Sequence, residues 1–225
     1  SMGSLDFLPD GTPITLSSYY GMNHNCLLCT WDKLTGDKTN EVQFYVLGNT
    51  EMYVNADIVV IDQNKVILPL DYYDGDTYGT EIISWDPIGD VTNWSFNINA
   101  ADYNDFDQDA TGLGIDLENN IYINGYGRGL TKFSQGGSLE WARVTDYYLP
   151  GLAVSPKGDC YMYGVENDNI LTVAKISSSG DLVWSYDISL SSGGNLSDAS
   201  WSDMANDSAN WLNDNLYLAA TYTPI

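Results

Sequence analysis

Alternating aspartates in the middle of the chain form the pattern with the clearest chemistry. Asp105, Asp107 and Asp109 follow a D-x-D-x-D spacing, and Asp116 stands at position 12 counted from Asp105. In calcium-binding loops, oxygens at positions 1, 3 and 5 converge on one cation and a later carboxylate completes its shell. Ala110 replaces the usual glycine, and Asp116 also fits the turn of a hairpin. The pattern predicts a calcium site, with a solvated acidic loop as the alternative.

A second acidic stretch, 71–78, mixes carboxylates with tyrosines, and Asp-Tyr-Tyr recurs at 146–148. Aromatic rings can stack on the apolar face of a sugar while carboxylates accept hydrogen bonds from its hydroxyl groups. Tyrosine is also favoured in β-sheets, so a structural role is the alternative. For Arg128, in a glycine-rich connection, the alternative is a surface ion pair. The candidate ligand-binding residues are Tyr72, Tyr73, Asp74, Asp76, Tyr78, Tyr147, Tyr148 and Arg128.

The three cysteines indicate structure rather than chemistry. Cys26 and Cys29 have C-x-x-C spacing, but they lie in the apolar run 26–31, which is typical of a strand. Residues three apart on a strand face opposite sides of a sheet, so the two thiols should not converge on a metal or form a redox pair. With Cys160 the count is odd, which does not fit a disulfide framework. We expect buried thiols.

The elements that must position these residues repeat along the chain. A hairpin with an Asp, Asn, Gly or Pro turn occurs at 5–16, 56–69, 112–125, 151–164 and 211–220. A second hairpin, which brings in an aromatic residue, follows at 29–46, 83–94, 130–141 and 173–184. Corresponding positions recur 39 to 56 residues apart, which is typical of four-stranded propeller blades. Trp85, Trp94, Trp141 and Trp184 lie at the aromatic positions of the repeat, where we expect them to pack between blades.

The repeat also resembles a known family. The stretch 112–144 contains Asn-Asn-Ile-Tyr-Ile-Asn-Gly, Leu-Thr-Lys-Phe and Gly-Gly-Ser-Leu-Glu-Trp. These segments resemble the blade motif of bacterial and viral β-propeller repeat proteins and, more distantly, the quinoprotein-like propeller repeat that ends in G-x-h-x-W. The resemblance implies a propeller fold, and it implies the surface, scaffold or binding roles that most family members have.

We therefore predict an all-β chain, a β-propeller of four-stranded antiparallel blades in a single domain over 5–225. The predicted blades are roughly 5–50, 56–100, 110–146, 149–190 and 199–225. The last unit has no second hairpin, so four blades plus an extra hairpin, or a longer natural chain, are alternatives to five blades. Residues 1–4 have the composition of an expression-tag remnant and are set aside.

Composition narrows the function. The net charge is −23, and 25 Asp but only 6 Glu carry the acidity. Such a field repels nucleic acids and anionic membranes, and no run approaches the roughly 18 apolar residues of a membrane helix. We predict a non-catalytic binding or adhesion module of an extracellular, cell-surface or virion protein, with a glycan or protein surface ligand. The alternatives are a structural virion or surface assembly component and a five-bladed glycoside-processing enzyme with paired carboxylates. The oligomeric state is left open.

Overall fold

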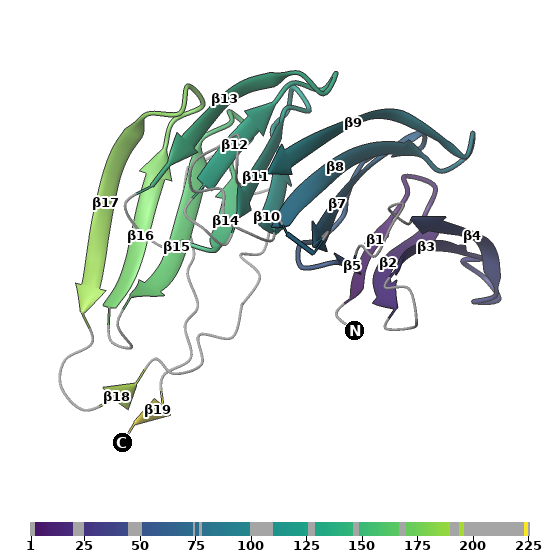
Figure 1. Cartoon of the computed structure of the whole chain (residues 1–225), viewed down its shortest axis with the longest axis horizontal. Coiled ribbons are helices and arrows are strands. Elements are labelled where there is room, and N and C mark those ends of the chain that lie inside the picture. Colours follow the sequence, from purple (N-terminus) through teal and green to yellow (C-terminus); the bar gives the residue numbers. More distant parts are fainter. Residues whose placement is uncertain are drawn as a thin grey trace.

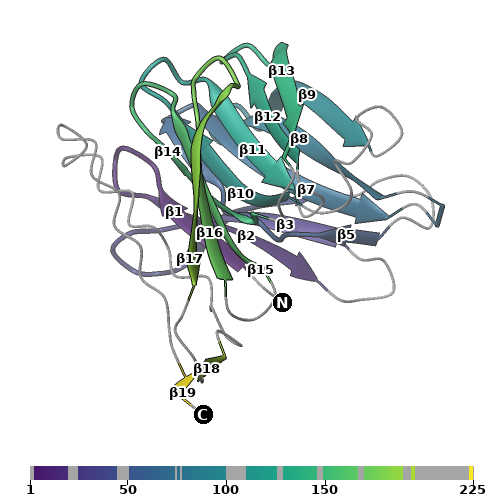
Figure 2. The ribbon, with the colours of Figure 1, turned by 90° about the vertical axis from the view of Figure 1, so that its left-hand side faces the viewer.

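The computed structural model consists of β-strands and connections within the residues that it describes. These residues are 3–19, 25–44, 51–73, 75–76, 78–99, 110–125, 129–145, 149–166, 170–189, 194–195 and 223–224. The strands form antiparallel sheets that stand side by side along an arc (Figures 1 and 2). Within this described part, no helix is long and apolar enough to cross a membrane.

Each of the four larger sheets is one blade, and apart from β5 and β6 in blade 2, neighbouring strands in a blade follow one another in the chain. Blade 1 contains β1 (Gly3–Phe7), β2 (Pro13–Tyr19), β3 (Asn25–Trp31) and β4 (Lys38–Phe44). Blade 2 contains β5 (Glu51–Tyr53), β6 (Val59–Asp62), β7 (Lys65–Tyr73), β8 (Tyr78–Asp86) and β9 (Val91–Asn99); both β5 and β6 pair with β7. Blade 3 contains β10 (Ala110–Ile115), β11 (Ile121–Gly125), β12 (Gly129–Phe133) and β13 (Leu139–Val144). Blade 4 contains β14 (Gly151–Val154), β15 (Cys160–Glu166), β16 (Ile170–Ile176) and β17 (Leu182–Ser189). A separate two-stranded sheet is formed by β18 (Gly194–Asn195) and β19 (Thr223–Pro224).

These sheets confirm the predicted all-β fold of four-stranded antiparallel blades. Of the predicted fifth blade, 199–225, only β19 lies within the described residues, so a count of five stays a prediction. At the other end, β1 already begins at Gly3. Ser4 is buried there, and its hydroxyl accepts a hydrogen bond from the Ile58 backbone N–H at 2.9 Å. Residues that we had set aside from the fold therefore belong to its first strand.

Aspartate side chains close the turns of the first hairpin in successive blades, as predicted. The Asp10 carboxylate accepts a hydrogen bond from the Thr12 backbone N–H at 2.9 Å, and Asp62 accepts one from Asn64 at 2.8 Å. Asp116 occupies the same place in blade 3. An aspartate of this kind satisfies backbone donors that the turn leaves without a strand partner. Part of the acidity is therefore used in turns.

The core lies between successive blades. On β7, Val66 and Leu68 pack in the cluster shared with blade 1, whereas Ile67 packs in the cluster shared with blade 3. Side chains alternate along a strand, so each inner strand supplies one set of apolar residues to each neighbour. A third cluster joins blades 3 and 4 around Tyr122 and Met162.

Two tryptophans connect one blade to the turn of the next. The Trp94 indole N–H on β9 donates to the Gln135 carbonyl of blade 3 at 3.3 Å. Trp141 on β13 donates to the equivalent Ser178 carbonyl of blade 4 at 3.1 Å. Trp85 also packs between blades, because its ring meets that of Phe44 edge to face at a centroid distance of 5.2 Å. These three side chains confirm the predicted packing role.

Candidate functional site

Two tyrosines form an aromatic surface at the end of the β7–β8 hairpin. Tyr73 and Tyr78 are direct partners in the strand ladder, and their rings stack with centroids 4.4 Å apart and planes 26° apart. The Tyr73 hydroxyl donates to the Gly75 carbonyl at 2.7 Å, which ties the connecting loop to the strand. Tyr78 and Asp76 are exposed. This Tyr73–Tyr78 pair combines a flat apolar surface with a carboxylate in the adjoining loop.

Tyr72 lies on the other face of the same strand. Its ring packs against the core between blades 1 and 2, and its hydroxyl donates to the Asn97 side-chain oxygen at 2.9 Å. Gly79 makes room for the ring, since a Cβ at that position would lie 2.5 Å from the Tyr72 hydroxyl oxygen. Adjacent strand residues point in opposite directions. The structure therefore separates Tyr72 from the Tyr73–Tyr78 pair, although the three residues are close in sequence.

A buried carboxylate supports this end of blade 2. Asp71, on the same face of β7 as Tyr73, is fully buried. Its carboxylate accepts hydrogen bonds from the Thr80 hydroxyl at 2.5 Å, the Ala110 backbone N–H at 2.8 Å and the Asn55 side-chain amide at 3.2 Å. Ala110 begins blade 3, so Asp71 links two blades. Asp71 begins the acidic stretch 71–78 but was not among the predicted ligand-binding residues; its place directly after the apolar run 66–70 was the available signal.

Most of the other candidate residues lie outside the described part of the chain. This holds for the potential ligand-binding residues Asp74, Tyr147, Tyr148 and Arg128, and for the calcium-loop residues Asp105, Asp107 and Asp109. Their predicted roles stay predictions. Ala110 follows Asp109 in the sequence, at position 6 of the predicted loop, and its backbone N–H donates a hydrogen bond to Asp71. Asp71 and Ala110 thus meet at the junction of blades 2 and 3.

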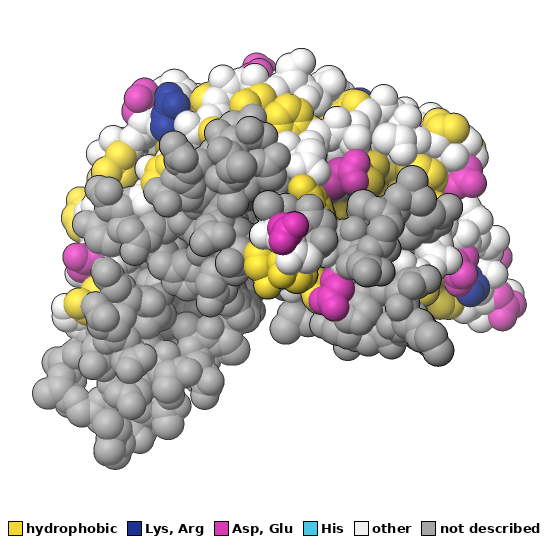
Figure 3. Space-filling view, viewed as in Figure 1, with side chains coloured by type: hydrophobic (Ala, Val, Ile, Leu, Met, Phe, Trp, Pro, Cys, Tyr) yellow, Lys and Arg dark blue, Asp and Glu magenta, His cyan; other side chains and the backbone are white. Residues whose placement is uncertain are grey.

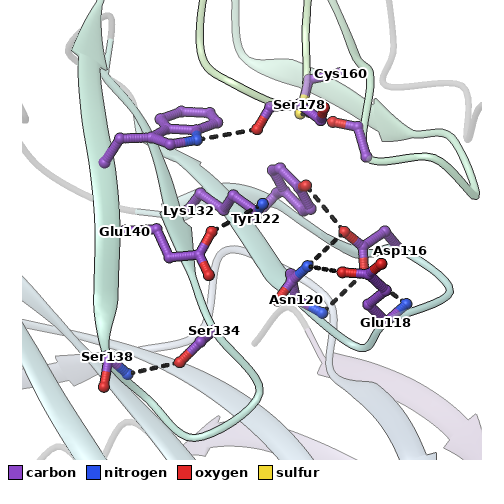
Figure 4. A network of polar contacts seen from close by, with 12 residues as sticks. Asp116, Glu118, Asn120, Tyr122, Lys132, Ser134, Ser138, Glu140, Cys160 and Ser178 are labelled. Atoms are coloured by element: carbon purple, nitrogen blue, oxygen red, sulfur yellow. Dashed lines mark hydrogen bonds and ion pairs between the residues drawn. The ribbon is translucent and has the colours of Figure 1, made fainter.

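Asp116 is described, and it is used in a turn of blade 3 (Figure 4). One carboxylate oxygen accepts hydrogen bonds from the backbone N–H groups of Glu118 and Asn120, each at 2.9 Å. The other accepts from the Asn120 amide at 2.9 Å and the Tyr122 hydroxyl at 3.0 Å. Burial, followed by the hydrogen bond to Asp116, raises the pKa of Tyr122 far above its usual value. This geometry accounts for Asp116 as a turn residue, which was the alternative to its role as a calcium ligand.

Among the described residues, no group of three or more His, Cys, Asp or Glu side chains is arranged to hold a metal ion. Cys26, Cys29 and Cys160 are buried and unpaired with one another, as predicted. Burial, with a smaller effect from the charge of Asp71, raises the pKa of Cys26 to about 12. Burial also raises the pKa of Cys160. These thiols are therefore protonated and poorly nucleophilic in the folded protein.

The described surface is acidic. In Figure 3, acidic side chains are scattered over several parts of the molecule, whereas Lys and Arg appear in few places. Some of the cations are already engaged, as in the ion pairs of Lys132 with Glu140 at 2.8 Å and Lys175 with Asp159 at 2.7 Å. Such a surface disfavours anionic ligands.

Solved structures resemble this chain in fold. A luciferin-regenerating enzyme matches with a TM-score of 0.51 and 13% identity, covering 84% of this chain and 63% of that chain. That enzyme is a β-propeller. This chain has the β-propeller fold. BamB from Moraxella catarrhalis, also a propeller, matches with a TM-score of 0.46 and 13% identity, covering 82% of this chain and 60% of that one.

A protein of unknown function from Bacteroides caccae matches with a TM-score of 0.42 and 8% identity, covering 82% of this chain and 81% of that one. No protein-family model matches the sequence, and no curated protein matches it. The propeller spans 63% of the luciferin-regenerating enzyme and 60% of BamB. At these identities the likeness concerns the fold alone.

Proposed function

We propose that this propeller is a non-catalytic binding module and that the Tyr73–Tyr78 pair is part of its ligand surface. The observation that carries the proposal is the stacked geometry of the pair, with ring centroids 4.4 Å apart and Tyr78 exposed. A rigid aromatic surface with a neighbouring carboxylate suits a sugar, whose C–H face is apolar and whose rim carries hydroxyl groups. Asp76 supplies the carboxylate, and the acidic surroundings favour a neutral glycan over an anionic one.

The rigidity of the site supports the same proposal. Tyr73 is held by the strand ladder and by its hydrogen bond to the Gly75 carbonyl. Asp71, two residues before Tyr73 and on the same face of β7, is fixed by three described hydrogen-bond donors. Side chains that are ordered before binding lose less conformational entropy when the ligand arrives. Asp74, Tyr147, Tyr148 and Arg128 belong to the proposed surface, and a calcium ion in the Asp105 loop is its proposed support. Display outside a cell or on a virion is part of the proposal.

The test is a glycan array followed by titration of the strongest neutral glycan, with and without a calcium chelator. Tyr78→Ala should weaken binding about tenfold, because it removes one stacking surface. Tyr78→Phe retains the ring and should bind nearly as well as the original chain. An array without signal above background, or equal affinities for the Tyr78→Ala and unaltered proteins, would contradict the glycan proposal. A loss of glycan binding in the presence of chelator would support the calcium part of the proposal.

A further inference from the structure

The contact between blades 2 and 3 shows how the outer strand of one blade is covered by the next. On β9, Trp94, Phe96 and Ile98 occupy alternate positions on the face turned toward blade 3. Phe96 meets Phe133 of blade 3 with ring centroids 4.9 Å apart, and Ile98 is only 1% exposed. The outer strand of a blade that has a successor is therefore apolar on this face and covered.

Strand β17 is the corresponding strand of blade 4. Trp184 lies opposite Lys175, the residue that precedes the bulge in β16. Trp94 has the same position in blade 2, opposite Ser84, which precedes the bulge in β8. Tyr186 and Ile188 follow at alternate positions, as Phe96 and Ile98 do on β9. However, Tyr186 is 65% exposed and Ile188 is 47% exposed. We call this surface the open face of β17; it has the pattern of a blade contact without a described blade against it.

The tryptophan of an outer strand has a specific partner in the next blade. Trp94 lies over Gly137, where an added Cβ would be 2.5 Å from the indole, and Trp141 lies over Gly180, where the distance would be 3.1 Å. Both glycines have positive φ and stand in the turn between the third and fourth strands. A flat indole can approach the backbone this closely only where there is no side chain.

Where the tryptophan is missing, the residue with positive φ in the facing turn is not a glycine. Blade 1 has Asn40 at the tryptophan position, and the facing turn of blade 2 has Asp90 at the residue with positive φ. Trp184 is the remaining tryptophan of this kind among the described residues. The remaining glycine with positive φ between a third and a fourth strand is Gly36 of blade 1, and an added Cβ there would have no atom within 4 Å. Its turn differs from the other two, because the Gly36 N–H donates to the carbonyl four residues earlier, whereas Gly137 and Gly180 donate to the carbonyl three residues earlier.

Blade 1 also presents the matching face. Leu5 and Phe7 on β1 are 60% and 54% exposed, and they alternate with Ser4 and Asp6, which contact blade 2. Trp31 follows the bulge in the third strand, where Trp85 and Phe133 stand in the blades that have a predecessor. We call the surface around Leu5, Phe7 and Trp31 the open face of blade 1.

We propose that the open face of β17 binds the open face of blade 1 in a second copy of this chain, with Trp184 seated over the turn at Gly36. This contact continues the row of blade-to-blade interfaces already present in the chain. Figure 1 shows blades 1 and 4 at opposite ends of the arc, so one chain does not join its own two faces in this structure. Such a head-to-tail contact either closes into a ring or extends into a row.

The test measures molar mass by light scattering and sedimentation, from micromolar to near-millimolar protein. The mass should rise above 24.8 kDa with concentration, and more so at high salt, because the net charge of −23 opposes association. Tyr186→Asp and Phe7→Asp should each abolish the rise, since each places a charge in one of the two faces. Leu117→Asp is the matched control, because Leu117 is 81% exposed in a turn of blade 3, away from both faces.

Mixing the two defective variants provides the decisive measurement. Tyr186→Asp retains the face of blade 1, and Phe7→Asp retains the face of β17, so an equimolar mixture should form a complex of twice 24.8 kDa although neither variant associates alone. Circular dichroism and thermal melts serve to check that both variants are folded. A constant mass of 24.8 kDa for the unaltered chain, or a mixture that stays monomeric, would overturn the proposal. If the unaltered chain stays monomeric and Tyr186→Asp lowers its melting temperature, the face of β17 would instead be covered by the chain itself.

Discussion

The carboxylate of Asp71 accepts a hydrogen bond from the backbone N–H of Ala110 at 2.8 Å, and this contact links β10 of blade 3 to β7 of blade 2. Both residues are fully buried. The same carboxylate binds the Thr80 hydroxyl within its own blade. A single side chain therefore fixes both the hairpin that carries the Tyr73–Tyr78 pair and the first residue of β10.

Replacing Asp71 by alanine should destabilise the fold strongly. The Ala110 N–H and the Thr80 hydroxyl would lose a buried acceptor, and a buried donor without a partner costs about 1–3 kcal/mol. We expect a loss of about 3 kcal/mol in urea unfolding for Asp71→Ala and a smaller loss for Asp71→Asn, which keeps one acceptor oxygen. Asp76→Ala, at an exposed position of the same hairpin, is the control. Equal unfolding curves for the two alanine variants would contradict this role.

Alanine at Gly137 should cost more than alanine at Gly36. Both glycines have positive φ, so both substitutions incur a backbone penalty of about 1 kcal/mol. At Gly137 the new Cβ would also lie 2.5 Å from the Trp94 ring, whereas at Gly36 no atom lies within 4 Å. We expect an additional loss of about 1–3 kcal/mol for Gly137→Ala. The comparison uses chemical unfolding of dilute protein, and equal losses would remove the tryptophan–glycine contact as a stabilising feature.

The cysteines should resist thiol reagents in the native state. Burial raises the pKa of Cys26 to about 12 and also raises that of Cys160, so little thiolate is present near neutral pH. Titration with a chromogenic disulfide should show slow labelling of the folded chain and rapid labelling of all three thiols in denaturant. Rapid reaction of Cys26 under native conditions would mean that β3 opens readily.

The aspartate turns should contribute stability that depends on pH. Backbone hydrogen bonds from Thr35 and then Leu34 lower the pKa of Asp32 from its ordinary value of 3.8. A carboxyl group with a lowered pKa stabilises the folded state above its unfolded pKa, and the contribution is lost as the pH falls through the folded value. The stability difference between the unaltered chain and Asp32→Ala should thus be present above pH 3.8 and shrink below it. Urea unfolding at a series of pH values measures this difference; a constant difference would argue against the ionised turn.

The predicted calcium loop can be tested in the same protein. Calcium should raise the melting temperature, because a ligand that binds only the folded state stabilises it in proportion to the logarithm of its concentration. Asp107→Asn should reduce this shift, since Asp107 stands at position 3 of the loop and loses its charge. Asp90→Asn, in an exposed turn of blade 2, controls for the change of net charge. A melting temperature that does not respond to calcium would favour the solvated acidic loop.

Local patterns were sufficient for the repeated parts of the fold. The recurring hairpins predicted the blades, and Asp10 and Asp62 lie in the predicted turns, where each accepts a hydrogen bond from the backbone N–H two residues further on. Trp94 and Trp141 were predicted to pack between blades, and they bind the next blade through its turn carbonyls. These features depend on neighbouring residues or on a repeated spacing, and both are visible in one sequence.

Contacts between distant segments were decided only by the tertiary structure. Asp71 and Ala110 are 39 positions apart, and nothing in either stretch indicates the other. Tyr72 and Tyr73 are adjacent in the chain, but Tyr72 packs against the core shared with blade 1 whereas Tyr73 stacks on Tyr78 at the opposite face of β7, because which face of a strand meets a neighbouring blade depends on how the sheets stack. The sequence by itself determined strands, turns and the repeat, since these are local. Burial and pairing arose only when the blades were placed side by side, because both are properties of the neighbours that packing supplies.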